Sequence, residues 1–253
     1  MRRVSRQQVI WGVVAIVGIA ALGLLIWGVR WATFARPPLP EAAAALASDG
    51  TVTVATDRWL TFTPTQAHDT GFIFYPGGRV DPRAYAGLMR TIAEAGYLVV
   101  VPSMPINMAI FNTNAANPII AAQPDVDRWV IGGHSVGGTA AAIYASAHPD
   151  RIAGLAIWSS FPAGNSDISE LDLPVILLYG GNETGVTDES VGARKHLLPP
   201  DTRYIRIEGG DHHRFGAYAL TTEDDLATIS RGAQHAHILR ATLDLLRVVA
   251  ERP

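Results

Sequence analysis

Ten residues near the middle of the chain constrain its fold more than any other stretch. They read Trp129-Val-Ile-Gly-Gly-His-Ser-Val-Gly-Gly138, an apolar run that leads through Gly133-His-Ser-Val-Gly137 into an alanine-rich segment. The apolar run is typical of a buried strand, and the alanines favour a helix. Glycines two residues before and after Ser135 permit a sharp turn, because side chains there would collide with neighbouring backbone. The pattern predicts Ser135 on a strained strand-to-helix turn.

The remainder of the chain beyond residue 50 alternates short β-rich runs with helical patterns. This alternation is typical of a mostly parallel sheet covered by helices on both faces, so we expect an α/β fold with an eight-stranded, mostly parallel sheet. The clearest helices are expected at residues 83–95, 136–147 and about 232–251, the last with an apolar face at Leu239, Leu243, Leu246 and Ala250. The strands are expected at residues 51–55, 59–62, 71–75, 97–101, 129–132, 152–158, 175–179 and 203–207.

An acid is expected after the strand at 175–179, because a serine on such a turn works with an acid and then a histidine in chain order. Glu183 and Asp188 both lie in that loop. Glu183 is preferred because its spacing from Gly180 and Val186 matches the pattern G-x-x-D-x-x-V, with glutamate in place of aspartate. Asp188 has an alternative role as the cap of the helix that follows.

Two adjacent histidines follow the last expected strand, in Glu208-Gly-Gly-Asp-His-His-Arg-Phe-Gly216. One of them must reach Ser135 to act as general base and later as general acid. We prefer His212, with His213 as the alternative. The two histidines and Asp211 also raise the possibility of a metal site, but no third ligand follows at a convincing spacing, so neither a metal nor a cofactor is expected.

The loop after the third strand, Tyr75-Pro-Gly-Gly-Arg79, is the expected source of a backbone donor. The N–H groups of Gly78 and Val136 would together form an oxyanion hole. Arg79 either binds a carboxylate of the substrate or lines the rim of the pocket. The apolar residues within 104–117 either cover the pocket, which favours a modest acyl or alcohol group, or form the buried face of the helix before the fifth strand.

A run of 21 residues without charge, 9–29, lies close to the N-terminus. A helix of this length spans the roughly 30 Å hydrocarbon core of a bilayer. The arginines in residues 1–8 favour a cytoplasmic N-terminus, so we expect a single-pass protein of the cell membrane whose catalytic domain lies outside the cytoplasm. The alternatives are a cleaved signal peptide, with the alanine run 42–47 near the cleavage point, and a buried core helix.

The expected organisation has four parts. A basic tail (1–8) precedes the transmembrane anchor (9–29), a linker (30–49) and an α/β-hydrolase-like catalytic domain (50–253). Within the linker, Arg36-Pro-Pro-Leu-Pro40 indicates a stiff extended spacer.

Composition excludes several classes of function. The net charge of −3 combines 20 basic with 23 acidic residues, and five of the arginines lie in the first 36 residues, where there is no acid. The remaining 15 basic residues against 23 acids give the rest of the chain a net charge of −8, which disfavours binding to nucleic acid. The chain has no cysteine, which excludes disulfides, thiolate metal ligands and a cysteine nucleophile.

These motifs resemble those of small bacterial α/β-hydrolases related to the dienelactone hydrolase group. The resemblance covers residues from about 50 to the C-terminus and implies Ser135 as nucleophile, Glu183 as acid and His212 as base. Dienelactone hydrolases proper use cysteine as nucleophile, so their lactone substrate is not carried over. The matching segments are Tyr75-Pro-Gly-Gly-Arg-Val-Asp-Pro-Arg-Ala-Tyr85, Gly132-Gly-His-Ser-Val-Gly-Gly138, Gly180-Gly-Asn-Glu183 and Gly209-Gly-Asp-His-His-Arg-Phe-Gly-Ala-Tyr218.

Taken together, the sequence predicts a membrane-anchored serine hydrolase that cleaves a carboxylic ester, or a similar acyl bond, through an acyl-enzyme. Its expected partners are a small-molecule ester and the lipid bilayer. Two alternatives remain open at this point. An acyltransferase would use the same three residues, and a catalytically silent scaffold would share the fold, because fold does not fix function.

Overall fold

The computed structural model describes residues 6–66, 69–221 and 224–252, and the chain forms two compact units, residues 1–34 and 35–253. The first unit contains α1 (Arg6–Thr33). In the parts of the chain that are described, this is the one helix long and apolar enough to cross a membrane, over Arg6–Trp31, and its 18-residue apolar window has a mean hydropathy of 2.8. No part of that stretch is buried, so the alternative of a buried core helix is wrong. A signal sequence meets the same criterion of length and composition.

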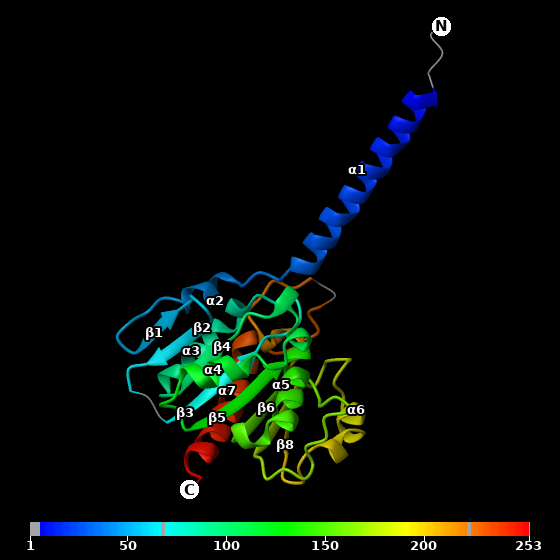
Figure 1. Ribbon diagram of the computed structural model, residues 1–253. Helices are drawn as coiled ribbons and strands as arrows, with labels where there is room; N and C mark the ends of the chain where they lie inside the picture. The colour runs from blue at the N-terminus through cyan, green and yellow to red at the C-terminus, as the bar shows by residue number, and fades with distance from the viewer. Residues whose placement is uncertain (1–5, 67–68, 222–223, 253) are drawn as a thin grey trace. The chain divides into compact units, whose positions relative to one another are not determined.

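The second unit is built on one sheet, and all eight predicted strands are present (Figure 1). The strand order is β1-β2-β4-β3-β5-β6-β7-β8. β1 is antiparallel to β2 and β2 to β4, whereas every other neighbouring pair is parallel. The strands are β1 (Val52–Ala55), β2 (Leu60–Pro64), β3 (Thr70–Tyr75), β4 (Leu98–Val101), β5 (Arg128–His134), β6 (Gly154–Trp158), β7 (Val175–Gly180) and β8 (Arg203–Ile207).

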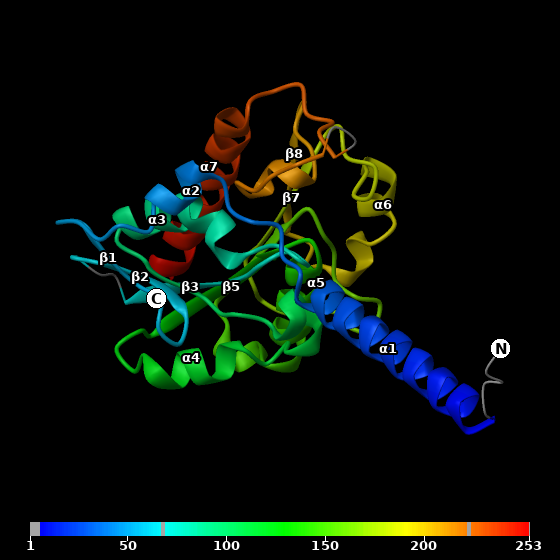
Figure 2. The ribbon, with the colours of Figure 1, turned by 90° about the horizontal axis from the view of Figure 1, so that it is seen from above.

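Helices cover both faces of the sheet, with α3 and α7 on one face and α4 and α5 on the other (Figure 2). The α-helices of this unit are α2 (Pro40–Ala44), α3 (Ala86–Glu94), α4 (Ala116–Ala122), α5 (Val136–Ala147), α6 (Asp188–Gly192) and α7 (Arg231–Ala250). The 3-10 helices are η1 (Pro82–Tyr85), η2 (Pro105–Asn107), η3 (Ala109–Phe111), η4 (Pro149–Arg151), η5 (Lys195–Leu197) and η6 (His213–Phe215).

The two faces of the sheet are equally apolar because alternate residues of the buried strands point in opposite directions. In β3, Phe72 and Phe74 pack in the core beneath α3 and α7, whereas Ile73 and Tyr75 pack beneath α4 and α5. Every residue of β3 is buried. A strand buried on both sides reads as a continuous apolar run, and this explains why the central strands were visible in the sequence.

The long helix α7 packs on the sheet through a face rotated from the predicted one. Of the predicted contact residues Leu239, Leu243, Leu246 and Ala250, only Leu246 is fully buried, and the other three lie at the edges of the contact. The buried face consists of Gln234, Ile238, Ala241, Thr242, Leu245, Leu246 and Val249. The apolar arc of this helix is wide, so its spacing alone did not fix which line of residues meets the sheet.

His235 of α7 gives the fold an acid-sensitive point. Burial, with the nearby charge of Arg231, lowers the pKa of His235 from 6.5 to about 4. Between pH 6.5 and 4, His235 is therefore protonated in the unfolded chain but neutral in the folded chain. The free energy of unfolding falls as pH is lowered through this window.

We expect His235→Gln to remove up to about 3 kcal/mol of this pH-dependent loss of stability, measured as the free energy of unfolding between pH 7 and 4. His237→Gln, on the exposed side of the same helix, is the control. Parallel stability curves for wild type and His235→Gln would contradict the assignment.

The segment predicted as a spacer packs against the domain. The N–H of Arg36 donates to the carbonyl oxygen of Arg79 at 2.7 Å, and β-bridges join Arg36 to Val80 and Pro38 to Tyr218. The Arg36 guanidinium also pairs with Asp224 at 2.6 Å. This extended segment therefore lies beside two loops at the carboxyl edge of the sheet, the one after β3 and the one after β8.

Candidate active site

Ser135 lies on a sharp turn between β5 and α5, as predicted. Its backbone φ is 54°, which a non-glycine residue rarely adopts, and its N–H donates to the carbonyl oxygen of Trp158 at 2.9 Å. The flanking glycines are required by close backbone contacts. A Cβ on Gly137 would lie 2.2 Å from the carbonyl oxygen of Tyr75, and a Cβ on Gly133 would lie 2.4 Å from the backbone of Gly137.

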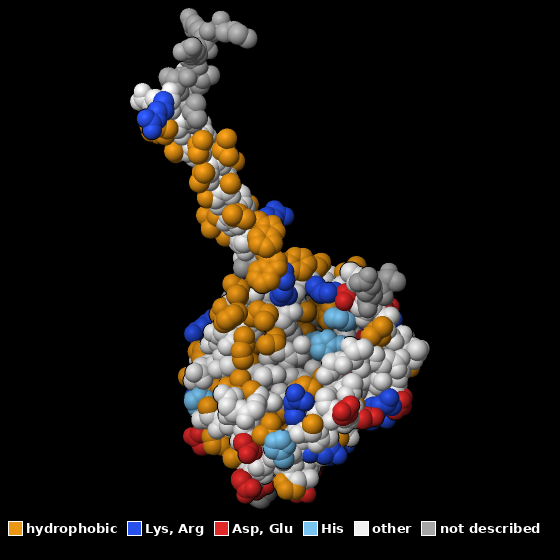
Figure 3. Space-filling view, turned by 90° about the vertical axis from the view of Figure 1, so that its right-hand side faces the viewer, with side chains coloured by type: hydrophobic (Ala, Val, Ile, Leu, Met, Phe, Trp, Pro, Cys, Tyr) orange, Lys and Arg blue, Asp and Glu red, His pale blue; other side chains and the backbone are white. Residues whose placement is uncertain are grey.

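The structure brings Ser135, His212 and Glu183 together from three separate loops. The Ser135 hydroxyl lies 3.1 Å from His212 Nε2, and His212 Nδ1 lies 3.0 Å from Glu183 Oε2. Histidine side chains line a hollow on this face of the domain (Figure 3). The imidazole thus lies between a hydroxyl and a carboxylate, an arrangement in which it can take the hydroxyl proton while the carboxylate stabilises the imidazolium that forms.

Glu183 is held by the backbone of its own loop. Its side chain is buried, and its Oε1 accepts a hydrogen bond from the N–H of Gly180. Because Oε1 is occupied in this way, Oε2 is left to face the imidazole of His212. Glu183 was preferred from the sequence because it lies three residues after Gly180. This spacing allows its carboxylate to accept the hydrogen bond from the Gly180 N–H.

The two alternative residues lie away from Ser135. His213 contacts the Tyr218 hydroxyl at 3.2 Å through Nδ1 and Asp224 at 3.4 Å through Nε2. Asp188 accepts a hydrogen bond from the Tyr179 hydroxyl at 2.5 Å. Asp188 is not the cap of α6, since Thr187 takes that position and its hydroxyl oxygen accepts from the N–H of residue 190.

Gly78 and Val136 lie side by side, since a Cβ on Gly78 would come within 3.0 Å of the Val136 side chain. Across residues 6–66, 69–221 and 224–252, no hydrogen bond occupies the N–H of either residue. Arg79 has φ 58°, and its N–H donates to the carbonyl oxygen of Asn107 at 2.7 Å. The two free N–H groups are available for an oxygen atom near Ser135.

A model of the alpha/beta hydrolase family matches residues 71–236, which contain Ser135, Glu183 and His212. The chain belongs to the alpha/beta hydrolase family. This confirms both the predicted fold and the predicted membership of a hydrolase family. A comparison with curated proteins found none that matches.

Solved structures share the fold of this hydrolase at low sequence identity. Est1E from Butyrivibrio proteoclasticus, solved with ferulic acid bound, is 12% identical over 80% of this chain and 98% of its own, with a TM-score of 0.57. A CIB-like hydrolase from Thermoplasma acidophilum is 15% identical over 77% and 96%, with a TM-score of 0.55. A bacterial membrane phospholipase A is 15% identical over 94% and 99%, with a TM-score of 0.54.

A buried network that the sequence analysis missed links three loops of the hydrolase. The N–H of Gly77 donates to the Tyr85 hydroxyl at 3.1 Å, and that hydroxyl lies 2.9 Å from Nδ1 of His134. Burial raises the pKa of the Tyr85 hydroxyl and lowers the pKa of His134, so Tyr85 donates and the imidazole is neutral. Its proton is therefore on Nε2, which donates to the carbonyl oxygen of His212 at 2.9 Å. His134, the residue before Ser135, thus supports the backbone of His212.

A second missed pair fixes the loop that carries His212. Asp211 is buried, and its carboxylate accepts hydrogen bonds from the N–H groups of Arg214, Leu226 and Ala227 at 2.8 to 3.1 Å. The side chain of Gln234 donates to the carbonyl oxygen of Asp211 at 2.8 Å and accepts from its N–H at 3.1 Å. Asp211 therefore shapes this loop through its carboxylate and its own backbone.

Apolar side chains are exposed in the segment next to the loop after β3. Ile106 is 44% exposed and Phe111 is 61% exposed, whereas Met104 and Ala109 are buried. Met108 lies against Gly78, since its sulfur would be 2.9 Å from a Cβ there. The segment precedes α4 and is only partly in the core, so part of it contributes to the buried face, and its role as a cover of the pocket stays a prediction.

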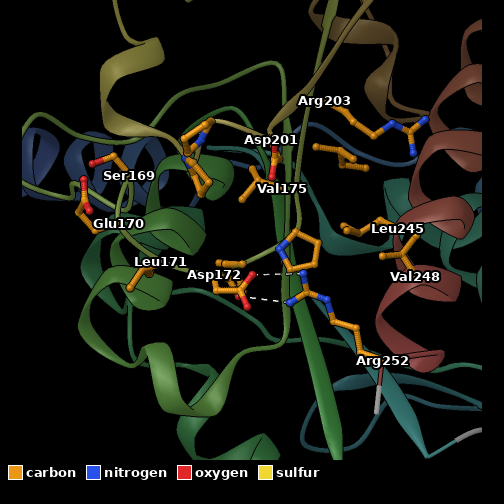
Figure 4. Close-up of a pocket in the computed structure, with 15 residues that line it drawn as sticks. Ser169, Glu170, Leu171, Asp172, Val175, Asp201, Arg203, Leu245, Val248 and Arg252 are labelled. Carbon is orange, nitrogen blue, oxygen red and sulfur yellow. Dashed lines mark hydrogen bonds and ion pairs between the residues drawn. The ribbon is translucent and has the colours of Figure 1, made fainter.

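Two cavities of the hydrolase differ in their position relative to the site. A small one, about 270 Å³, is lined by His212, Glu183 and Leu226 among others. A larger one, about 530 Å³, lies at the other end of β7, where Val175 begins the strand and Arg252 pairs with Asp172 at 3.3 Å (Figure 4). In the described parts of the chain, no group of three or more His, Asp or Glu side chains could hold a metal ion.

Proposed function

We propose that this hydrolase cleaves a carboxylic ester by nucleophilic catalysis through Ser135, His212 and Glu183. The observation that carries the proposal is the position of the His212 imidazole, with Nε2 3.1 Å from the Ser135 hydroxyl and Nδ1 3.0 Å from Glu183. These are the distances at which a serine, a histidine and a carboxylate act as one unit.

In the first step, Ser135 Oγ attacks the ester carbonyl carbon while His212 Nε2 takes the hydroxyl proton. The carbonyl oxygen becomes negatively charged and accepts hydrogen bonds from the N–H groups of Gly78 and Val136. Glu183 stabilises the positive imidazolium. When the bond to the alcohol breaks, His212 gives its proton to the leaving oxygen, and the acyl group remains bound to Ser135.

In the second step, His212 removes a proton from water, and the resulting oxygen nucleophile attacks the acyl-enzyme. The bond to Ser135 breaks, Oγ regains the proton from His212, and the carboxylic acid leaves. The sum of the two steps is one ester and one water converted to one acid and one alcohol, with the protein unchanged.

The exposed apolar side chains of Ile106 and Phe111 support an ester with an apolar acyl or alcohol group, because they lie beside the loop that carries Gly78. One of the structural neighbours, a membrane phospholipase A, agrees with an ester substrate. Arg79, the residue after Gly78, adds a cation to the same loop.

We further propose that α1 anchors the protein in the cell membrane, with the catalytic domain outside the cytoplasm. The support is the length and apolar composition of Arg6–Trp31 and the arginines ahead of it. Reaction of an introduced cysteine in the domain with a membrane-impermeant thiol reagent on intact cells tests this orientation, since the chain has no other cysteine. Labelling only after cell lysis would contradict it.

Ser135→Ala tests the proposed activity. With the full-length chain in detergent and a panel of esters of varied acyl length, we expect the variant to lower kcat by about 10⁴- to 10⁶-fold, because the nucleophile is lost. Wild type should also be labelled at Ser135 by a fluorophosphonate probe, and the variant should not.

Three outcomes would redirect the proposal. Equal ester hydrolysis by Ser135→Ala would overturn it. Failure of the probe to label wild type, together with no turnover of any ester, would favour a catalytically silent scaffold. Faster transfer of the acyl group to an added alcohol than to water would favour an acyltransferase that uses the same three residues.

A further inference from the structure

Ser159 is a buried polar residue that the proposed reaction does not use. It is the first residue after β6, the strand between the nucleophile strand β5 and the acid strand β7. Its side chain is only 1% exposed, and its backbone φ is 46°. A buried hydroxyl needs a hydrogen-bond partner, and a left-handed serine carries a backbone cost of about 1–2 kcal/mol. The Ser159 side chain therefore points into the protein interior, and its backbone conformation costs some folding stability.

The hydroxyl of Ser159 contacts both partners of the proposed charge pair. It donates a hydrogen bond to Glu183 Oε2, and its oxygen lies 2.5 Å from His212 Nδ1. The same two groups contact each other directly at 3.0 Å. Ser159, Glu183 and His212 thus form a closed triangle of polar contacts.

The proton count fixes the direction of these bonds. The Ser159 hydroxyl has one hydrogen, which it gives to Glu183, so its lone pairs face His212. Nδ1 of His212 then carries the ring proton and shares it between the carboxylate and the hydroxyl oxygen. This is the tautomer that leaves Nε2 unprotonated and able to accept the proton of Ser135.

We propose that Ser159 is a positioning residue that holds Glu183 and His212 in the geometry and tautomer required for catalysis. This inference rests on the proposed function. Ser159 touches neither Ser135 nor a substrate, and it works through the other two residues. The positive charge on His212 develops only in the transition state, so the contribution of Ser159 to catalysis should be expressed in kcat and not in substrate binding.

The chain offers a matched control in the next residue. Ser160 is also buried at the end of β6, but its hydroxyl lies 2.9 Å from the Thr139 hydroxyl and not against the triad residues. Replacing either serine by alanine removes one buried hydroxyl from the same region. A difference between the two variants therefore reports on the contact with His212 and Glu183 and not on the loss of a buried hydroxyl.

The test is the steady-state kinetics of full-length Ser159→Ala and Ser160→Ala on an ester that wild type hydrolyses. We expect Ser159→Ala to lower kcat by about 10- to 100-fold, as for the loss of one hydrogen bond to a charged group, with KM within about threefold of wild type. We expect kcat of Ser160→Ala to stay within about threefold of the wild-type value. Ser159→Gly removes the same hydroxyl without the left-handed strain, so it supplies the measurement if the alanine variant does not fold.

A double-mutant cycle with Glu183→Gln separates positioning from a general structural role. If Ser159 acts through Glu183, adding Ser159→Ala to Glu183→Gln should lower kcat by less than about threefold further. An unchanged kcat in both Ser159 variants, an equal loss in Ser160→Ala, or the same 10- to 100-fold loss in the Glu183→Gln background would each overturn the inference. Ser135→Ala, measured in parallel, distinguishes these results from failure of the proposed function, because only that failure leaves Ser135→Ala active.

Discussion

Glu183→Gln is expected to lower kcat by about 10⁴-fold while the protein remains folded. An amide at this position presents an N–H₂ group or a weaker acceptor to Nδ1 of His212, which favours the wrong tautomer and removes the charge that stabilises the imidazolium. The carboxylate is buried and in contact with His212 at 3.0 Å, so water cannot replace it. Single-turnover kinetics with a chromogenic ester measure the effect directly.

Asp188→Asn is the matched control for the acid. Asp188 lies in the same loop region, but its side chain is 69% exposed and pairs with Tyr179 and Arg206. We expect kcat of this variant to stay within about twofold of wild type, because exposed ion pairs contribute little. A larger loss of kcat in Asp188→Asn than in Glu183→Gln would indicate that Asp188, and not Glu183, is the acid.

Gly137→Ala is expected to destabilise the protein by about 3 kcal/mol or more and to abolish activity. The new methyl group would lie 2.2 Å from the carbonyl oxygen of Tyr75 and 2.5 Å from that of Pro76. Both contacts are with backbone of the loop that carries Gly78, so no side-chain rotation relieves them. The free energy of unfolding and labelling of Ser135 by a fluorophosphonate probe are the two measurements.

Gly87→Ala provides the comparison for this substitution. Gly87 is an exposed residue of α3, and a Cβ added there would have no atom within 4 Å outside its own stretch of helix. Alanine there should stabilise the helix by up to about 1 kcal/mol and leave activity unchanged. If both glycine variants had the same stability, the close approach at Gly137 would not be the reason for a glycine in the turn.

The parts of the fold that follow from local patterns were predicted well. The central strands β3 to β7 were visible because a strand buried on both faces is a short apolar run bounded by turn residues. The turn at Ser135 was visible because its two glycines are close in sequence. The contact face of α7 was wrong because Leu239 and Leu243 are as apolar as Ile238 and Leu245, and only the neighbouring strands decide between them.

The supporting residues of the candidate site could not be found in the same way. Ser159 is 24 residues from Glu183 and 53 from His212, and Tyr85 is 49 residues from His134. These residues come into contact only because β3, β5, β6 and β7 lie side by side in the sheet. A serine at the carboxyl end of a strand next to the nucleophile strand is the one signal that could have drawn attention to Ser159.

The extended segment that begins at Arg36 has a consequence for proteolytic release of the domain. Its backbone pairs with Arg79 and Val80 beside Gly78, and Pro38 pairs with Tyr218 in the loop after His212. A protease that cuts ahead of Ala35 would free a domain with these contacts intact. A cut within residues 42–47 would instead separate the domain from the segment that pairs with both loops, so the two cuts would leave these loops with different support.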